Sequence, residues 1–185
     1  MAHPDPRLLH ARWERLVRTR AASPGERLAA LVVDAGAARR GAVLVACEVA
    51  AVALDYVTDD RGTLAHCLDV ARWWAAREAG DDGLLAARTR AAEAAARTDA
   101  DGDRCAWLSL QVSVALVDVA LEPMVDLAGK RARDLAACAL EAMCWPDLDD
   151  EAVREAAVER LHGALDDAIA RARELEALLA KRRDG

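Results

Sequence analysis

Residues 104–121, Arg-Cys-Ala-Trp-Leu-Ser-Leu-Gln-Val-Ser-Val-Ala-Leu-Val-Asp-Val-Ala-Leu, are the most hydrophobic stretch of the chain and decide its fold. Apolar residues occupy nearly every position, so we expect a helix that is buried on most sides and lies at the centre of the protein. Pro123 sets its end, because the residue before a proline disfavours helical backbone. From Cys105 to Leu121 the stretch also carries Ser109, Gln111, Ser113 and Asp118, and we expect it to be too short and too polar to span a bilayer.

The residues on both sides of this stretch also favour helices. Alanine accounts for 45 of the 185 residues, and leucine, arginine and glutamate are the other strong helix formers that dominate the chain. Five prolines, ten glycines and no phenylalanine argue against a turn-rich sandwich or barrel. The sequence therefore predicts an all-α bundle of seven to eight helices in one domain. Its parts are basic N-terminal helices in 1–40, a helical core in 41–145 and a long amphipathic C-terminal helix in 150–182.

Local signals place the helices along the chain. Ser23-Pro24-Gly25-Glu26 predicts a capping box, in which Ser23 and Glu26 satisfy each other's backbone amides and Pro24 takes the first helical position. The polar segment 99–103 has the first three carboxylates of a calcium loop but lacks its glycine and closing glutamate, so we interpret it as a turn and helix cap. The helices expected around the central one begin at Asp5 (with apolar residues Leu9, Trp13, Leu16 and Val17) and cover 24–35, 42–57, about 63–80, 84–98, 124–144 and about 150–182.

The last of these helices has a regular apolar seam. Its residues recur with alternating steps of three and four, which is the heptad spacing of helices that pack side by side. Such a seam can lie along the helix's own bundle, or it can join two chains in a homodimer, and both interpretations are open at this point. The seam residues are Val158, Leu161, Leu165, Ala168, Ala172, Leu175 and Leu179.

Charge and cysteine usage narrow the class of partner and the compartment. The chain has a net charge of −7, although residues 1–40 carry eight arginines against four acids, so the remainder carries −11. An acidic surface does not suit nucleic acid and favours a basic protein partner. Five widely spaced cysteines, with no apolar leader segment before them, predict buried free thiols in a reducing cytoplasm.

Six residues are candidates for an interface. Polar residues that interrupt otherwise apolar helices either mark the solvent-facing stripe of each helix or line a cleft or partner-binding face. Neighbouring tryptophans cannot both point inward, so one of the pair should lie at the surface and could anchor an interface. These candidates are Glu48, Asp55, Trp73, Trp74, Gln111 and Asp118.

A metal site is the alternative interpretation of the same polar residues. Glu159 and His162 form a Glu-x-x-His pair on one helical face, and di-iron bundles combine such pairs with carboxylates from other helices. Glu48 and Asp118 could supply those carboxylates, which would make the protein a metal-dependent enzyme or ligand binder. Only one such pair exists in the chain, so we expect no metal and no cofactor.

One segment resembles a known family. Residues 68–78, Leu-Asp-Val-Ala-Arg-Trp-Trp-Ala-Ala-Arg-Glu, are similar to a segment of alanine-rich helical immunity proteins of actinobacteria. Cys47-Glu48, Asp60-Arg61 and the alanine-rich stretch 88–97 fall at comparable places, so the similarity covers about residues 42–97. That family places an alanine between the cysteine and the glutamate, and a histidine where this chain has Glu93. The resemblance implies a helical protein that acts without catalysis, by binding and blocking a toxin.

Overall fold

The computed structural model describes residues 22–35, 40–56, 61–76, 80–101, 103–145 and 147–181, with the side chains of 99–101 and 172–181 excepted. The described residues form helices and no strand, which confirms the predicted all-α bundle with a long C-terminal helix. The helix expected from Asp5, with Leu9, Trp13, Leu16 and Val17, lies outside them. The helices are α2 (Pro24–Ala35), α3 (Arg40–Ala53), α4 (Arg61–Ala75), α5 (Asp81–Asp101), α6 (Arg104–Leu121), α7 (Val125–Cys144) and α8 (Glu151–Lys181).

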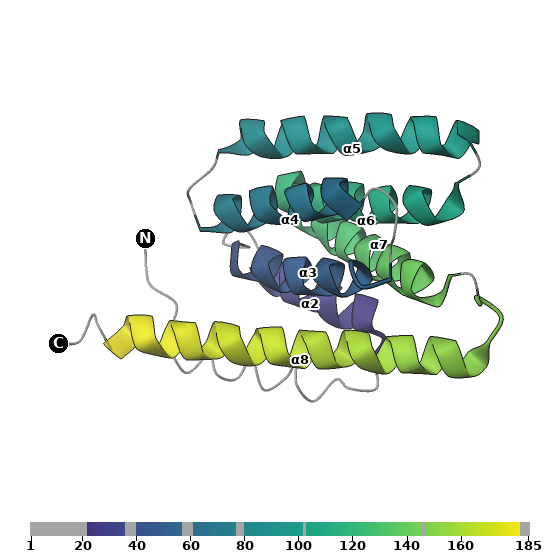
Figure 1. Ribbon diagram of the computed structural model, residues 1–185. Coiled ribbons are helices and arrows are strands. Elements are labelled where there is room, and N and C mark those ends of the chain that lie inside the picture. Colours follow the sequence, from purple (N-terminus) through teal and green to yellow (C-terminus); the bar gives the residue numbers. More distant parts are fainter. Residues whose placement is uncertain are drawn as a thin grey trace.

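The bundle is layered around α6 (Figure 1). α5 forms one outer layer and packs on α4 and α6, while α8 lies on the opposite side against α2, α3 and α7. α6 contacts α3, α4, α5 and α7, so the most hydrophobic helix occupies the centre, as predicted. By length and composition α6 could cross a membrane, contrary to our expectation from its polar residues, but 61% of it is buried inside the bundle. This burial indicates the core helix of a soluble protein.

α2 begins at the predicted capping box and packs closely against α7. The predicted capping box begins α2: Glu26 accepts a hydrogen bond from the Ser23 amide at 2.9 Å, and the Ser23 hydroxyl accepts one from the Glu26 amide at 3.3 Å. Further along the contact, a Cβ atom placed on Gly129 of α7 would lie 2.6 Å from Cγ2 of Val33. A larger residue at position 129 would therefore force the Val33 side chain or the helices to shift, and only glycine allows this approach as it stands.

Helix ends differ from the sequence prediction where no strong cap is present. α6 follows the prediction, because the Asp103 carboxylate accepts a hydrogen bond from the Ala106 amide at 3.1 Å. α3 ends at Ala53 and not near residue 57, since the amides of Leu54 and Tyr56 bond three residues back and tighten the last turn. α4 ends at Ala75, before residue 80, and α5 runs from Asp81 to Asp101, beyond the expected span of 84–98. The polar segment expected to be a turn is thus helical up to Asp101, and Asp103 supplies the expected cap.

The apolar seam of α8 packs inside the chain over its described part. Leu161, Leu165 and Ala168 are buried, and the helix packs on α3, α7 and α2. This supports the interpretation that the seam lies along its own bundle. The side chains of Ala172, Leu175 and Leu179 lie outside the described residues, and a homodimer through the C-terminal helix stays a prediction.

Candidate functional site

Glu48 is held between two arginines of its own chain. Its carboxylate is 2.8 Å from the Arg171 guanidinium and 3.2 Å from that of Arg72, and its side chain is 30% exposed. The three residues belong to α3, α8 and α4, so the ion pairs link three helices. Two arginines of the same chain thus balance the charge of Glu48 at a partly exposed position, and its part in an interface stays a prediction.

Asp118 of α6 is likewise held between two arginines of its own chain. Its carboxylate is 2.5 Å from Nε of Arg88 and 3.8 Å from Nε of Arg131, and its side chain is only 12% exposed. The hydrogen bond to Asp118, with the attraction of its charge, raises the pKa of Arg88 above the usual arginine value. Asp118 thus joins α6 to α5 and α7 at a largely buried position, and its part in an interface stays a prediction.

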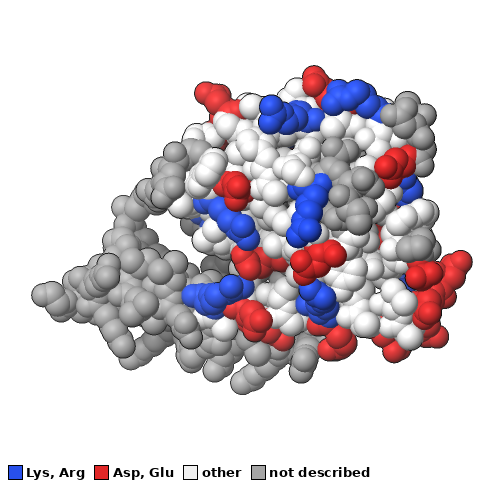
Figure 2. All heavy atoms as spheres, viewed as in Figure 1, with Lys and Arg blue, Asp and Glu red and all other residues white. Residues whose placement is uncertain are grey.

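Asp55 lies at the surface between α3 and α8. Its carboxylate is 2.5 Å from the guanidinium of Arg160, and both side chains are about half exposed. The same arginine donates to the hydroxyl of Tyr56 at 3.0 Å and lies 5.1 Å from the centre of its ring. Acidic and basic side chains alternate across the middle of this face in Figure 2. An exposed ion pair of this kind contributes little to stability.

The two tryptophans divide as predicted, with one inside and one outside. Trp74 is 8% exposed and its indole N–H donates to Asp81 at 2.7 Å, while the guanidinium of Arg40 lies 4.5 Å from the ring centre. Trp73 is 50% exposed. Trp74 therefore joins α4 to α5 and is covered by Arg40, and of the pair only Trp73 can serve as a surface anchor.

Gln111 lines a hollow between α5 and α6. It is half-buried, and the hollow has a volume of about 270 Å³. Its other walls are three alanines of α5 and two apolar residues of α6, one of which, Trp107, is covered by Arg104 at 4.1 Å from the ring centre. Gln111 thus lies in a shallow apolar groove and not on an open polar face. The lining residues are Ala92, Ala95, Ala96, Trp107, Gln111 and Val114.

The residues of the alternative metal site do not come together. His162 is buried, and its Nδ1 lies 2.9 Å from a guanidinium nitrogen of Arg27, whereas Glu159, three residues earlier on α8, is exposed. Glu48 and Asp118 are bound by arginines, as described above. Within the described part of the chain, no three or more His, Cys, Asp or Glu residues are arranged to hold a metal ion.

The five cysteines are free thiols. Burial raises the pKa of Cys47 to about 12 and those of Cys67 and Cys138 to about 11, because a thiolate is poorly solvated inside the bundle. At neutral pH these side chains are protonated and chemically inert. Cys47 and Cys67 are small apolar residues of the core, and Cys138 is half-buried and packs against it.

An acidic segment covers the connection from α7 to α8 and the first turns of α8, and no sequence pattern described above pointed to it. Residues 147–160 contain six carboxylates against two arginines, a net charge of −4. Asp150 caps α8, because its carboxylate accepts from the amides of Ala152 at 2.9 Å and Val153 at 3.3 Å. Figure 2 shows acidic side chains gathered at the edge where Figure 1 draws this connection. The exposed acids are Asp147, Asp149, Asp150, Glu151, Glu155 and Glu159.

The acidic segment begins next to an exposed aromatic residue. Trp145 follows the last residue of α7 and is 38% exposed. Tryptophan beside a charged rim is a frequent anchor of protein interfaces. We name Trp145 together with residues 147–155 the acidic end.

Comparison of the chain with family models, curated proteins and solved structures finds no match.

Proposed function

We propose that the protein is a non-enzymatic interaction protein of the immunity type, which binds a basic partner protein in the cytoplasm and blocks it. The observation that carries this proposal is the contrast between two sets of carboxylates. Glu48 and Asp118 are bound by arginines within the bundle, whereas Asp147, Asp149 and Glu155 are exposed at the acidic end. Exposed charges of one sign are available to a partner of the opposite sign.

Three further features support the proposal. The resemblance of residues 42–97 to immunity proteins implies a blocking partner, and a toxin with a basic surface would complement the acidic end. The buried thiols are protonated, so they do not provide a competing nucleophilic chemistry. All five cysteines are unpaired, which agrees with a reducing compartment.

Charge complementarity predicts a fast, salt-sensitive association with the partner. In the triple variant Asp147→Asn, Asp149→Asn and Glu155→Gln, the association rate constant at low salt should fall about tenfold. The reason is that these three charges attract the partner during encounter. Asp150 is left unchanged because it caps α8. The measurement is stopped-flow association with the basic protein encoded by an adjacent gene, at about 50 and 200 mM salt, where screening differs.

A matched variant carries the same change of net charge elsewhere. Asp69, Glu93 and Asp167 are also exposed, and their replacement by Asn, Gln and Asn should change the rate constant by less than about twofold. Equal losses in both triple variants would show that only the net charge matters. Equal rate constants in all three proteins would overturn the acidic end as the binding surface.

A further inference from the structure

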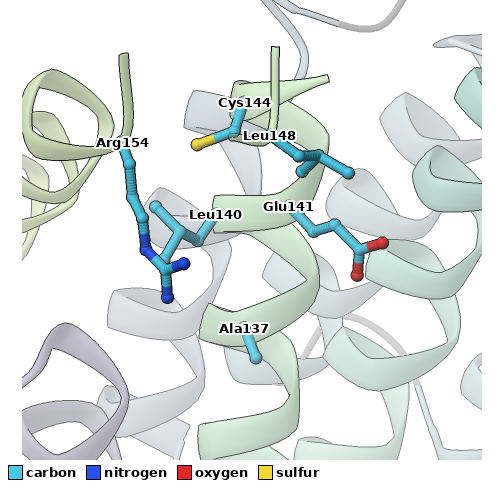
Figure 3. A pocket seen from close by; sticks show the side chains of 6 residues that line it. All are labelled: Ala137, Leu140, Glu141, Cys144, Leu148 and Arg154. Atoms are coloured by element: carbon cyan, nitrogen blue, oxygen red, sulfur yellow. The ribbon is translucent and has the colours of Figure 1, made fainter. Parts of the chain in front are cut away.

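A hollow opens beside the acidic end, between the last turns of α7 and the first turns of α8 (Figure 3). Its volume is about 270 Å³, which is below the usual range for sites that enclose a whole small-molecule ligand. It suits a single large side chain better. The residues that line it are Ala137, Leu140, Glu141, Cys144, Leu148 and Arg154.

Two of the six residues that line the hollow, Glu141 and Arg154, are charged, and the other four are uncharged. The Glu141 carboxylate accepts a hydrogen bond from Arg104 of α6, and Figure 3 shows it pointing away from Arg154. Burial raises the pKa of the Cys144 thiol more than the charge of Arg154 lowers it, so the sulfur is uncharged at neutral pH. Leu140, Leu148 and Ala137 supply the remaining wall.

Acidic residues are sequence neighbours of two residues that line the hollow. Leu148, which lines the hollow, lies between Asp147 and Asp149, and Arg154 is followed by Glu155. The two neighbours of Leu148 in the sequence, Asp147 and Asp149, are therefore exposed acids next to a residue of the wall. We name Asp147, Asp149 and Glu155 the acidic rim of the hollow. A hollow with apolar residues in its wall and such a rim fits a segment that carries a large apolar side chain between basic residues.

We propose that the hollow receives one large apolar side chain of the partner protein, phenylalanine or leucine, flanked by lysine or arginine residues that contact the acidic rim. This inference rests on the proposed function and adds the kind of segment by which the partner is recognised. The apolar side chain would be the energetic anchor, and the flanking charges would set its orientation and speed its arrival.

Two synthetic peptides test the inference with the full-length protein. Both have three Lys or Arg residues on each side of a central position, which is Phe in one peptide and Ser in the other. The Phe peptide should bind about tenfold more tightly, as expected for burial of one large apolar side chain. Fluorescence anisotropy of the dye-labelled peptides gives both dissociation constants.

A variant that fills the hollow provides the decisive comparison. Ala137 is exposed on α7 and lines the hollow. Ala137→Phe should therefore fill the hollow and abolish the preference for the Phe peptide, without disturbing the packing of the core. Ala86→Phe, at an exposed position of α5, is the matched control and should keep the tenfold preference. Survival of the preference in Ala137→Phe would overturn the inference.

The two proposals fail in different ways. Equal, salt-sensitive binding of both peptides would overturn the apolar anchor and leave the acidic end in place as a binding surface. Weaker binding of both peptides to the triple variant Asp147→Asn, Asp149→Asn and Glu155→Gln would support the acidic end independently. If neither peptide binds, both the apolar anchor and the acidic end as a binding surface would be overturned.

Discussion

Replacing Arg27 with alanine is expected to lower the free energy of unfolding by about 3 kcal/mol, through loss of a buried side chain and of its polar contacts. Arg27 is 2% exposed and lies in the first turns of α2. Its guanidinium is 2.9 Å from Nδ1 of His162 and 2.5 Å from the Asp166 carboxylate, both on α8. Alanine would leave a cavity and remove the polar link between the two helices.

The loss of stability in Arg27→Ala depends on how well water solvates the groups that Arg27 contacts. Asp166 is 40% exposed, so water can solvate its charge after the arginine is removed, and the expected loss lies at the lower end for a broken buried pair. Arg27→Met keeps most of the volume and should cost only about 1 kcal/mol, because a well-packed apolar group can replace a buried ion. Urea denaturation of both variants measures the difference. Equal losses for Ala and Met would show that charge, and not packing, gives Arg27 its role.

Raising the pH above 9 is expected to destabilise the protein through its buried thiols. The pKa of Cys47 is about 12 in the folded chain against an ordinary value of 9.0, so between these values the unfolded chain loses a proton that the folded chain keeps. The contribution of Cys47 is therefore fully present below pH 9 and is lost as the pH rises towards 12. The expected loss is about 1.4 kcal/mol per pH unit, or about 2 to 3 kcal/mol by pH 11.

Cys47→Ala separates this contribution from other titrations at high pH. The variant should be less stable than the wild type at pH 7 because it loses a buried atom, but its stability should fall less steeply between pH 9 and 11. Thermal unfolding followed by circular dichroism at several pH values gives both slopes. Parallel curves for the two proteins would contradict a buried, protonated Cys47.

The fold could be predicted well wherever local chemistry sets a helix end. Asp103 and Pro123 bound α6, and Ser23 with Glu26 begins α2, because caps and proline act on neighbouring backbone groups. The end of α5 could not be predicted in this way. Its polar residues suggested a loop after residue 98, but the helix continues to Asp101. Such continuation reflects tertiary context overriding weak local preference.

The environment of the polar residues could not be predicted from the sequence. Glu48 is bound by one arginine 24 positions away and another 123 positions away, and no periodic pattern links residues at such distances. The signal that could have pointed to these pairs is the excess of arginine over lysine, since the guanidinium group suits partly buried ion pairs. The acidic end was visible as a run of carboxylates in 147–155, but its exposure depends on how α7 and α8 meet.

Growth of cells that express the adjacent gene tests the central claim most directly. If the protein is an immunity protein, the neighbouring product should arrest growth when expressed alone, and co-expression of this chain should restore it. The triple variant Asp69→Asn, Glu93→Gln and Asp167→Asn should also restore growth, whereas Asp147→Asn, Asp149→Asn and Glu155→Gln should do so poorly. Growth arrest that the wild-type chain fails to relieve, or neighbouring products that are harmless, would contradict the account.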